Sequence, residues 1–395
     1  MEDGKRKKTR GQSVWSREAW LLASVVALAA MFAITGFAVS FYRGKQSSLA
    51  AMWFDRGDAA LKANHARQAI QDLRNALGFA PNNSTFQLRL AQALAADNQI
   101  DSAEFYLFDL WSREPGNGEI NLELGRLEAR KGRPDAVRYF DNAIYGSWKS
   151  HPIERRFETR VELFHYWLDR GNQAQAQAAL LALAAETPET DFARRTQIGV
   201  WQMQAGDPRH ALEQFQGALR LKPRYEAALG GAGAAEIAIG QYRDAIPYLQ
   251  AALRLNPRDA QAAAGLKLAQ LVQSSDPFVI GLSPDERDAR AIDAFLAGQA
   301  NLTVCATQQQ VPLEPGPGQS PENAFQQVWA RGASLRPLVT HLRGQPQNVL
   351  QFMTFAYAAE NLVAGECGPL EGKDKALWLI GKEHRLAEAN NPPAH

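Results

Sequence analysis

The sequence has few of the residues that build metal or catalytic centres. It contains two cysteines, Cys305 and Cys367, and neither has a second cysteine or a histidine at ligand spacing. The seven histidines are scattered and form no HExxH pair, and no GxSxG motif is present. The glycine-rich run at residues 230–236 has no strand pattern before it, as a dinucleotide-binding loop requires. We therefore predict no catalytic residues, no metal and no cofactor.

The chain also lacks an excess of charge of one sign. Lysine and arginine number 43 and aspartate and glutamate 42, which gives a formal net charge of +1. With balanced charge, the chain as a whole lacks the excess of positive charge with which proteins bind nucleic acid. Alternating Val/Ile/Thr runs bounded by turn residues are absent too, so an almost entirely helical protein is favoured. Its 395 residues allow more than one folding unit.

The same residue types return every 34 positions over roughly half of the chain. Small residues, alanines and prolines each recur at this interval, in the series Gly57, Ala91 and Gly125; Gly199 and Gly233; Ala69 and Ala103; Ala211 and Ala245; Pro81 and Pro115; Pro223 and Pro257. A fixed period of this length is typical of a repeat solenoid, in which each unit buries its apolar face against its neighbours. A generic alanine-rich helical domain would not need these matching offsets.

These residues resemble the tetratricopeptide repeat (TPR), a helix–turn–helix unit of 34 residues. The clearest copy, residues 50–83, has Trp53 and Gly57 in its first helix, Ala69 in its second helix and Pro81 at its end. Further copies are expected at residues 84–117, from residue 118 onward, and at 157–190, 192–225 and 226–259, with a capping helix at 260–273. The resemblance implies an all-α fold, a right-handed α-solenoid of TPR helical hairpins over residues 50–273.

The repeat register makes local predictions about packing. Gly57, Gly125, Gly199 and Gly233 should lie where the two helices of one unit nearly touch. The third copy is one residue short in the turn between its helices. In the fourth copy Phe164 stands where a small residue is usual, which predicts looser packing there.

An uncharged segment precedes the repeats. Residues 21–41 carry no charge and match the roughly 20 residues that cross a bilayer as a helix. Aromatic residues flank this segment, and basic residues are denser before it than after it: Lys5, Arg6, Lys7, Lys8, Arg10 and Arg17 precede it, and Arg43 and Lys45 follow it. The positive-inside rule predicts a cytoplasmic basic tail at 1–20, a transmembrane helix at 21–42 and an extracytoplasmic main domain.

Two other interpretations of this segment stay open. A cleaved signal peptide would have a shorter apolar run, although Ala38-Val39-Ser40 resembles a weak cleavage site. A buried core helix would more often be amphipathic. The length of the apolar run favours the membrane anchor over a signal peptide, and the dense basic flank argues against a buried helix. The sequence therefore predicts a single-pass protein of the inner (cytoplasmic) membrane with its main domain in the periplasm.

Residues 276–395 are predicted to form a smaller helical region that either continues the repeats or packs on the end of the solenoid. Ser283, Pro284 and Glu286 indicate a helix start, and a Pro/Gly-rich loop is expected near 311–321. Further helices are expected at 324–342, 348–363 and 373–389, before a frayed tail. Six aromatic residues are assigned to the core: Phe325, Trp329, Phe352, Phe355, Tyr357 and Trp378.

Each cysteine is expected to follow a helix of this region. In an oxidising compartment Cys305 and Cys367 would pair as a disulfide. The alternative is two unrelated buried thiols.

In TPR proteins the first helices of the units line a concave face. The positions carried over from this resemblance are Asp55, Asp58, Lys62, Arg89, Gln92, Glu123, Arg126, Arg130, Glu162, His165, Asp169, Gln197 and Gln204. Arg89, Arg126 and Arg130 fall on successive first helices and predict a basic strip for an acidic or amphipathic partner. The alternative is that these arginines are solvated or paired with Glu123 and nearby carboxylates.

Together these patterns predict a non-enzymatic, membrane-anchored TPR scaffold that mediates protein–protein interactions in assembly or secretion at the bacterial envelope. Its expected partners are other proteins, bound as a peptide or helix in the groove, and the membrane, but not nucleic acid. Two alternatives remain: an enzyme with an active site in residues 276–395, and a cytosol-facing adaptor with inverted topology.

Overall fold

The computed structural model describes residues 15–316, 318–340 and 345–390. Over these residues the chain is all-α, with no β-strand and one isolated bridge between Asn117 and Ser147. It divides into two compact units, Met1–Tyr166 and Trp167–His395, which are described separately. Lys5, Arg6, Lys7, Lys8 and Arg10 of the predicted cytoplasmic tail lie outside the described residues, as do residue 317 of the Pro/Gly-rich loop and residues 391–395 of the predicted frayed tail.

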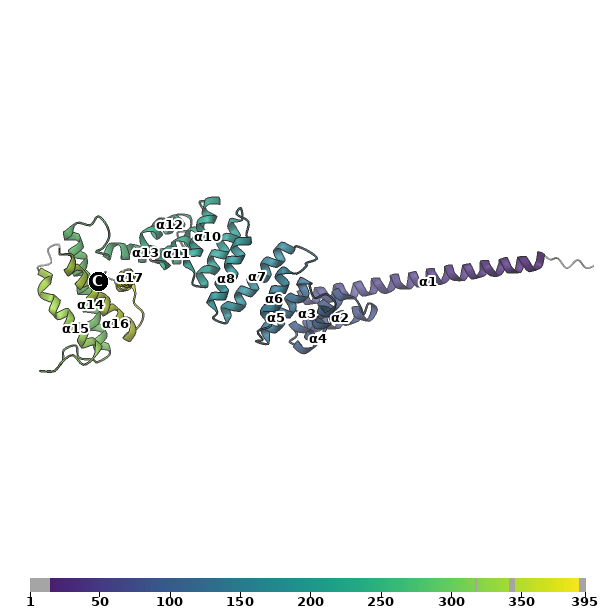
Figure 1. Cartoon of the computed structure of the whole chain (residues 1–395), viewed down its shortest axis with the longest axis horizontal. Helices are drawn as coiled ribbons and strands as arrows, with labels where there is room; N and C mark the ends of the chain where they lie inside the picture. The colour runs from purple at the N-terminus through teal and green to yellow at the C-terminus, as the bar shows by residue number, and fades with distance from the viewer. Residues whose placement is uncertain (1–14, 317, 341–344, 391–395) are drawn as a thin grey trace, which may run out of the picture. The chain divides into compact units, whose positions relative to one another are not determined.

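The first unit consists of one long helix followed along the chain by antiparallel helical hairpins (Figure 1). Its helices are α1 (Trp15–Lys62), α2 (Ala66–Phe79), α3 (Ser84–Ala96), α4 (Ile100–Arg113), α5 (Gly118–Arg130), α6 (Ala136–Tyr145) and the larger part of α7 (Pro152–Asp169). Helix α7 begins five residues before the predicted fourth copy, because the irregular stretch after Tyr145 is shorter than the sequence indicated.

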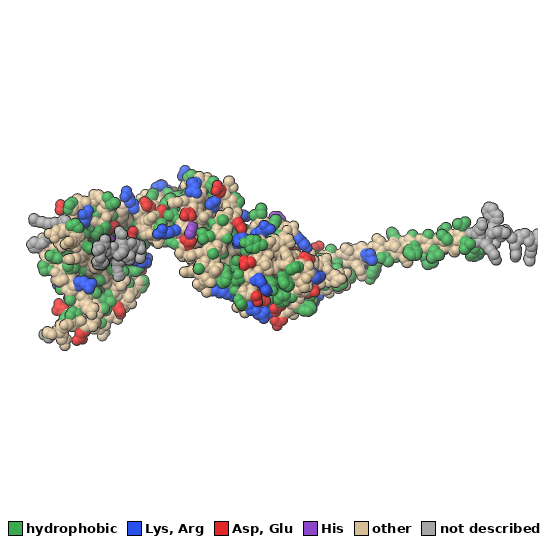
Figure 2. Space-filling view, viewed as in Figure 1, with side chains coloured by type: hydrophobic (Ala, Val, Ile, Leu, Met, Phe, Trp, Pro, Cys, Tyr) green, Lys and Arg blue, Asp and Glu red, His purple; other side chains and the backbone are tan. Residues whose placement is uncertain are grey.

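Helix α1 joins the predicted anchor to the first helix of the first repeat without a break. Its N-terminal part is exposed and apolar, as Figure 2 shows, whereas Ala50 and Ala60 are buried. By length and composition this helix can cross a membrane, with a mean hydropathy of 2.3 in its most apolar window.

The second unit continues with hairpins and then adds longer helices. It contains α8 (Gln173–Glu186), α9 (Phe192–Gln204), α10 (Pro208–Leu221), α11 (Glu226–Ala238), α12 (Tyr242–Leu255), α13 (Ala260–Ser275), α14 (Pro284–Gln308), α15 (Ala324–Leu335), the 3₁₀-helix η1 (Arg336–Thr340), α16 (Pro346–Glu366) and α17 (Gly372–Asn390). Ser283 caps α14 by accepting a hydrogen bond from the amide of Glu286, as predicted.

The turn inside each hairpin has one repeated geometry. A residue with positive φ stands at the same place in every copy: Asn64, Asn98, Gly132, Gly171, Gly206 and Gly240. The amide of the next residue donates back across the turn, for example from His65 to the Ala60 carbonyl at 2.8 Å and from Gln241 to the Glu236 carbonyl at 2.8 Å. This is the Schellman arrangement, in which glycine or asparagine takes the left-handed position and the chain reverses direction.

The predicted close approach of the two helices is confirmed in four units. A β-carbon on Gly57 would lie 2.7 Å from Leu73, and one on Gly199 would lie 2.8 Å from Phe215. The corresponding distances are 3.1 Å for Gly125 to Phe140 and 2.5 Å for Gly233 to Leu249. The partner is 16 positions later in three units and 15 positions later for Gly125, because the third copy is one residue short in its turn. Phe164 is fully buried, so the fourth copy accommodates a large side chain at this position.

The C-terminal helices have a core of their own. Phe295 of α14 lies against Phe352 and Phe355 of α16, with ring centroids 4.7 and 4.9 Å apart. All three are completely buried, and Phe325 is 6% exposed, whereas Trp329, Tyr357 and Trp378 are only partly buried. Helix α17 packs on the predicted capping helix α13 through Ala376, Leu377 and Ile380, which share a cluster with Ala269 and Val272.

Three predicted helix ends in this region were wrong. Helix α14 continues through Cys305 to Gln308, so Cys305 lies inside a helix and only Cys367 follows one. Helix α15 ends at Leu335 and gives way to η1, since Pro337 cannot continue an α-helix. Helix α16 extends to Glu366, beyond the predicted end at 363.

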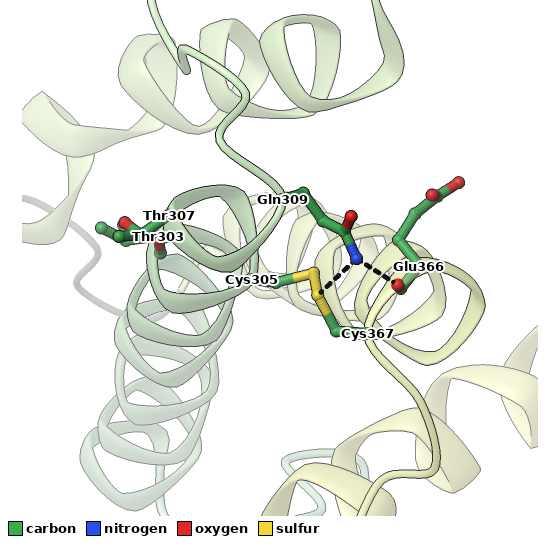
Figure 3. The surroundings of a disulfide bond; sticks show 6 residues. All are labelled: Thr303, Cys305, Thr307, Gln309, Glu366 and Cys367. Carbon is green, nitrogen blue, oxygen red and sulfur yellow. Dashed lines mark hydrogen bonds between the residues drawn. A yellow bond between two sulfur atoms is a disulfide. The ribbon is translucent and has the colours of Figure 1, made fainter.

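The two cysteines are bonded in the structure (Figure 3). The bond joins the end of α14 to the residue after α16, with Cα atoms 5.9 Å apart. Gln309 links the same two helix ends, because its amide donates to the Glu366 carbonyl at 2.6 Å.

A carboxyl group is buried between α14 and α16. Glu360 is completely buried, and its Oε1 accepts a 2.8 Å hydrogen bond from Asn301, whereas Oε2 has no partner among the described residues. Burial raises the pKa of Glu360 from 4.5 to about 7. Its ionisation therefore opposes folding: stability is intact below about pH 4.5 and is lost as the pH rises through about 7.

The variant Glu360→Gln keeps the acceptor for Asn301 but cannot ionise. We expect it to raise the free energy of unfolding at about pH 8 by up to a few kcal/mol, at about 1.4 kcal/mol per pKa unit, and to have little effect near pH 4. Urea unfolding of the variant and the unsubstituted protein at both pH values tests this. An equal change at both values would contradict the assignment.

Candidate functional site

Five predicted partner-binding residues meet at one hollow of the first unit. Arg89 and Gln92 on α3, and Glu123, Arg126 and Arg130 on α5, line a cavity of about 410 Å³. These residues lie on first helices of neighbouring hairpins, which the repeat period places on one face. The sequence thus predicted which side chains come together here.

Hydrogen bonds connect these side chains from one hairpin to the next. Arg89 contacts Asp58 of α1 at 2.8 Å and donates to Gln92 at 2.7 Å. Gln92 in turn donates to Glu123 of α5 at 2.9 Å. These hydrogen bonds link α1, α3 and α5, the first helices of three successive hairpins.

Arg126 extends the same hydrogen-bond network to Glu162 of α7. It donates to Glu123 at 2.7 Å and, through Nε, to Glu162 at 2.8 Å. The hydrogen bonds with Glu162 raise the pKa of Arg126 above its ordinary value. Arg130 donates to the backbone carbonyl of Ala95 at 2.8 Å.

The predicted basic strip is therefore corrected to a neutralised network. Arg89 and Arg126 are paired with Asp58, Glu123 and Glu162, which is the alternative that the sequence left open. Three further predicted positions lie elsewhere: His165 is exposed and does not line the hollow, Asp169 belongs to the second unit, and Asp55 is exposed on α1.

Removing the central cation of this network should destabilise the first unit slightly. Arg126→Met would leave Glu123 and Glu162 without it, and because the Arg126 side chain is 41% exposed we expect a loss of about 1 kcal/mol. Arg130→Met, on the same helix, is the control and should cost less. Urea unfolding of both variants measures the difference. Equal losses would show that the network does not stabilise the hairpins.

A second, larger groove lies in the second unit, across α9, α11 and α13. It has a volume of about 770 Å³, and we call it the α9–α11–α13 groove. Its lining is mostly apolar and includes Val200, Met203, Ala234, Ile237, Leu268 and Leu271. The turn between α16 and α17 adds Leu370 and Glu371, so the C-terminal helices supply part of the wall. Gln197 and Gln204 are exposed but do not line it.

Two adjacent glycines of α11 have different surroundings in this groove. A β-carbon on Gly231 would lie 2.5 Å from Phe215, whereas one on Gly230 would meet only Asp259 Oδ2, at 3.8 Å. Gly231 therefore permits helix packing, and Gly230 leaves open space on the groove floor. The sequence signalled this site only through the glycine-rich run at 230–236, which was considered as a dinucleotide-binding loop and rejected.

Among the described residues, no group of three or more His, Cys, Asp or Glu side chains is arranged to hold a metal ion. Helical hairpins repeated in this way define an α-helical repeat protein.

Comparison with known proteins identifies the repeat. Residues 60–111 match the family described as tetratricopeptide repeat, so the chain contains tetratricopeptide repeats. No curated protein matches it.

Solved structures are similar at the level of the fold alone. PilW, described as a widely conserved type IV pilus biogenesis factor, is 21% identical, and the match covers 54% of this chain and 96% of that one, with a TM-score of 0.38. PilF of Pseudomonas aeruginosa is 14% identical, and the match covers 55% of this chain and 97% of that one, with a TM-score of 0.38. The C-terminal part of a TPR protein of Cytophaga hutchinsonii is 16% identical, and the match covers 60% of this chain and 92% of that one, with a TM-score of 0.43.

Proposed function

We propose that this protein is a non-enzymatic scaffold that α1 anchors in a membrane and that binds another polypeptide in the α9–α11–α13 groove. The observation that carries the proposal is the apolar lining of that groove, which exposes Val200, Met203 and Ala234 beside the open floor at Gly230. Apolar surface in a groove of this size favours burial against a partner.

The hollow of the first unit is less suited to be the main binding surface. Its arginines already have carboxylate partners, and a ligand would have to break these contacts to form its own. We assign it a structural role between the hairpins and place the partner in the second unit.

The anchor orients the scaffold. The basic residues before residue 21 favour a cytoplasmic N-terminus, with both units on the opposite side, in the periplasm of a bacterial envelope. Such a location is oxidising, which suits the Cys305–Cys367 bond. A role in envelope assembly or secretion follows from this orientation. The cytoplasmic tail would then be residues 1–20 and the anchor residues 21–42. The solenoid would be residues 50–273 and the C-terminal region residues 276–395.

Reporter fusions after His395 test this topology. We expect an active alkaline phosphatase fusion and a dark fusion to a fluorescent protein that matures only in the cytosol, because the C-terminus would be exported. A bright fluorescent fusion with an inactive phosphatase would contradict the orientation.

Co-purification from membranes tests the scaffold role. Proteins that purify with the unsubstituted chain should be lost from the Gly230→Leu variant, whose new side chain fills the groove floor. Recovery of the same proteins with both chains would exclude this groove as the binding surface.

A further inference from the structure

We propose that the α9–α11–α13 groove takes an amphipathic helix with a small-residue apolar face and lysine or arginine at one end. This inference rests on the proposed function and adds the chemistry of the partner. Its basis is the floor of the groove, the charges at one edge and the wall from the C-terminal helices.

The floor favours a helical partner over an extended one. It is built from glycine and alanine, among them Gly230, Ala234, Ala262 and Gly265, on helices whose own hydrogen bonds occupy their backbone groups. An extended peptide would bury its N–H and C=O groups there without partners. A helix satisfies its backbone internally, and small side chains on both sides let the two backbones approach closely.

The dimensions agree with a short helix. On α11 the lining extends from Glu226 to Ile237, about 17 Å at 1.5 Å per residue, which equals about three helical turns. A helix of that length presents apolar side chains at i, i+3, i+4 and i+7 to a groove. Met203, which lines the groove, is an unbranched and flexible side chain that can adjust to them.

The edge where α11 and α13 begin is acidic. Glu226 stands in the first turn of α11, and Asp259 is the N-cap of α13; both are partly buried and both line the groove. The Oδ1 atom of Asp259 accepts from the amides of Gln261 and Ala262, and Oδ2 lies beside the open space at Gly230. A cationic side chain of the partner would pair with these two carboxylates.

The wall of the groove carries charges of both signs. Lys267 of α13 and Lys375 of α17 also line the groove and are exposed, and Glu371, four positions before Lys375, lies on the α16–α17 turn. A helix with a basic end and a neutral or acidic remainder complements this distribution, whereas a uniformly acidic helix would meet Glu226 and Asp259 with like charge.

The test uses the full-length chain in lipid nanodiscs and defined peptides. The probe is a fluorescent helical peptide of about three to four turns, with alanine and leucine on one face and two lysines at one end. A second peptide has glutamates in place of the lysines, and a third has the same composition in scrambled order. Fluorescence anisotropy gives the dissociation constants at low and high salt.

Two variants separate shape from charge. Gly230→Leu places a β-carbon whose only neighbour within 4 Å is Asp259 Oδ2, at 3.8 Å, so the new side chain is expected to enter the groove and not the core. A melting temperature equal to or above that of the unsubstituted protein verifies this. The double variant Glu226→Gln, Asp259→Asn removes both charges but keeps the acceptor for Asn256 and an efficient N-cap.

We expect the lysine peptide to bind the unsubstituted chain at least about tenfold more tightly than the Gly230→Leu variant, and several-fold more tightly than the charge variant. The charge variant should also lose the salt dependence of binding. Equal affinity for the lysine and glutamate peptides, or for the scrambled peptide, would overturn the partner chemistry even if membrane proteins still co-purify through the groove. The scaffold role would then stand and this inference would fail.

Discussion

Replacing Gly233 with leucine is expected to lower the free energy of unfolding of the second unit by about 1–3 kcal/mol or more. A β-carbon here would lie 2.5 Å from Cγ of Leu249 on the partner helix and 3.4 Å from the Ala245 carbonyl oxygen. Helix propensity acts in the opposite direction and favours the change by up to roughly 1 kcal/mol. A net loss therefore identifies a packed contact between helices.

A matched control lies three residues earlier on the same helix. Gly230→Leu makes the same chemical change where the β-carbon has open space, so propensity alone should act and stability should be equal or higher. Thermal melts followed by circular dichroism compare the two variants with the unsubstituted protein. If Gly233→Leu were neutral or stabilising, the register of the sixth repeat would be wrong.

Loss of the Cys305–Cys367 bond is expected to destabilise the C-terminal helices by about 2–4 kcal/mol. The two residues are 62 positions apart, and the chain-entropy argument gives about 4 kcal/mol for a loop of this length. Residual structure in the unfolded chain makes the measured loss smaller than that limit.

The double variant Cys305→Ser, Cys367→Ser measures this effect in urea unfolding. Alkylation of the denatured, unsubstituted protein before and after reduction gives the pairing itself, and we expect thiols to be labelled only after reductant. Two thiols that react without reductant would show that the cysteines do not pair in the protein.

The contacts within a hairpin could be predicted from the sequence because they are local and periodic. Gly57 meets Leu73, and Gly199 meets Phe215, at a separation that the repeat length fixes. The shorter turn of the third copy even accounts for the one-residue shift at Gly125. Contacts of this kind depend on the sequence of one unit alone.

The continuity of α1 was not predicted. The sequence predicted a transmembrane helix at 21–42 and a solenoid from residue 50, but residues 43–48 between them include no proline and only one glycine, Gly44. Nothing there ends a helix, and so the first helix of the first repeat extends into the candidate anchor. The helix does not end at residue 42, the predicted end of the transmembrane segment.

The functional surfaces were harder to predict, because they depend on contacts between units. Arg89 pairs with Asp58, 31 positions earlier and on another helix, and the sequence could not choose between that contact and a free cation. The groove of the second unit needs Leu370, more than a hundred residues after Ala234, to form its wall. Only the folded chain shows that Gly230 faces this space while Gly231 faces Phe215.

Site-specific photocross-linking in intact cells tests the central claim, that this protein holds a polypeptide in the α9–α11–α13 groove. A photoreactive amino acid replaces Ala234, which lines the groove, or Gln250, which is exposed on α12 and does not line it. We expect a discrete cross-linked polypeptide from position 234 that disappears when Gly230→Leu is added, and none from position 250. The same cross-links from both positions, or cross-links at 234 that persist with Gly230→Leu, would contradict the account.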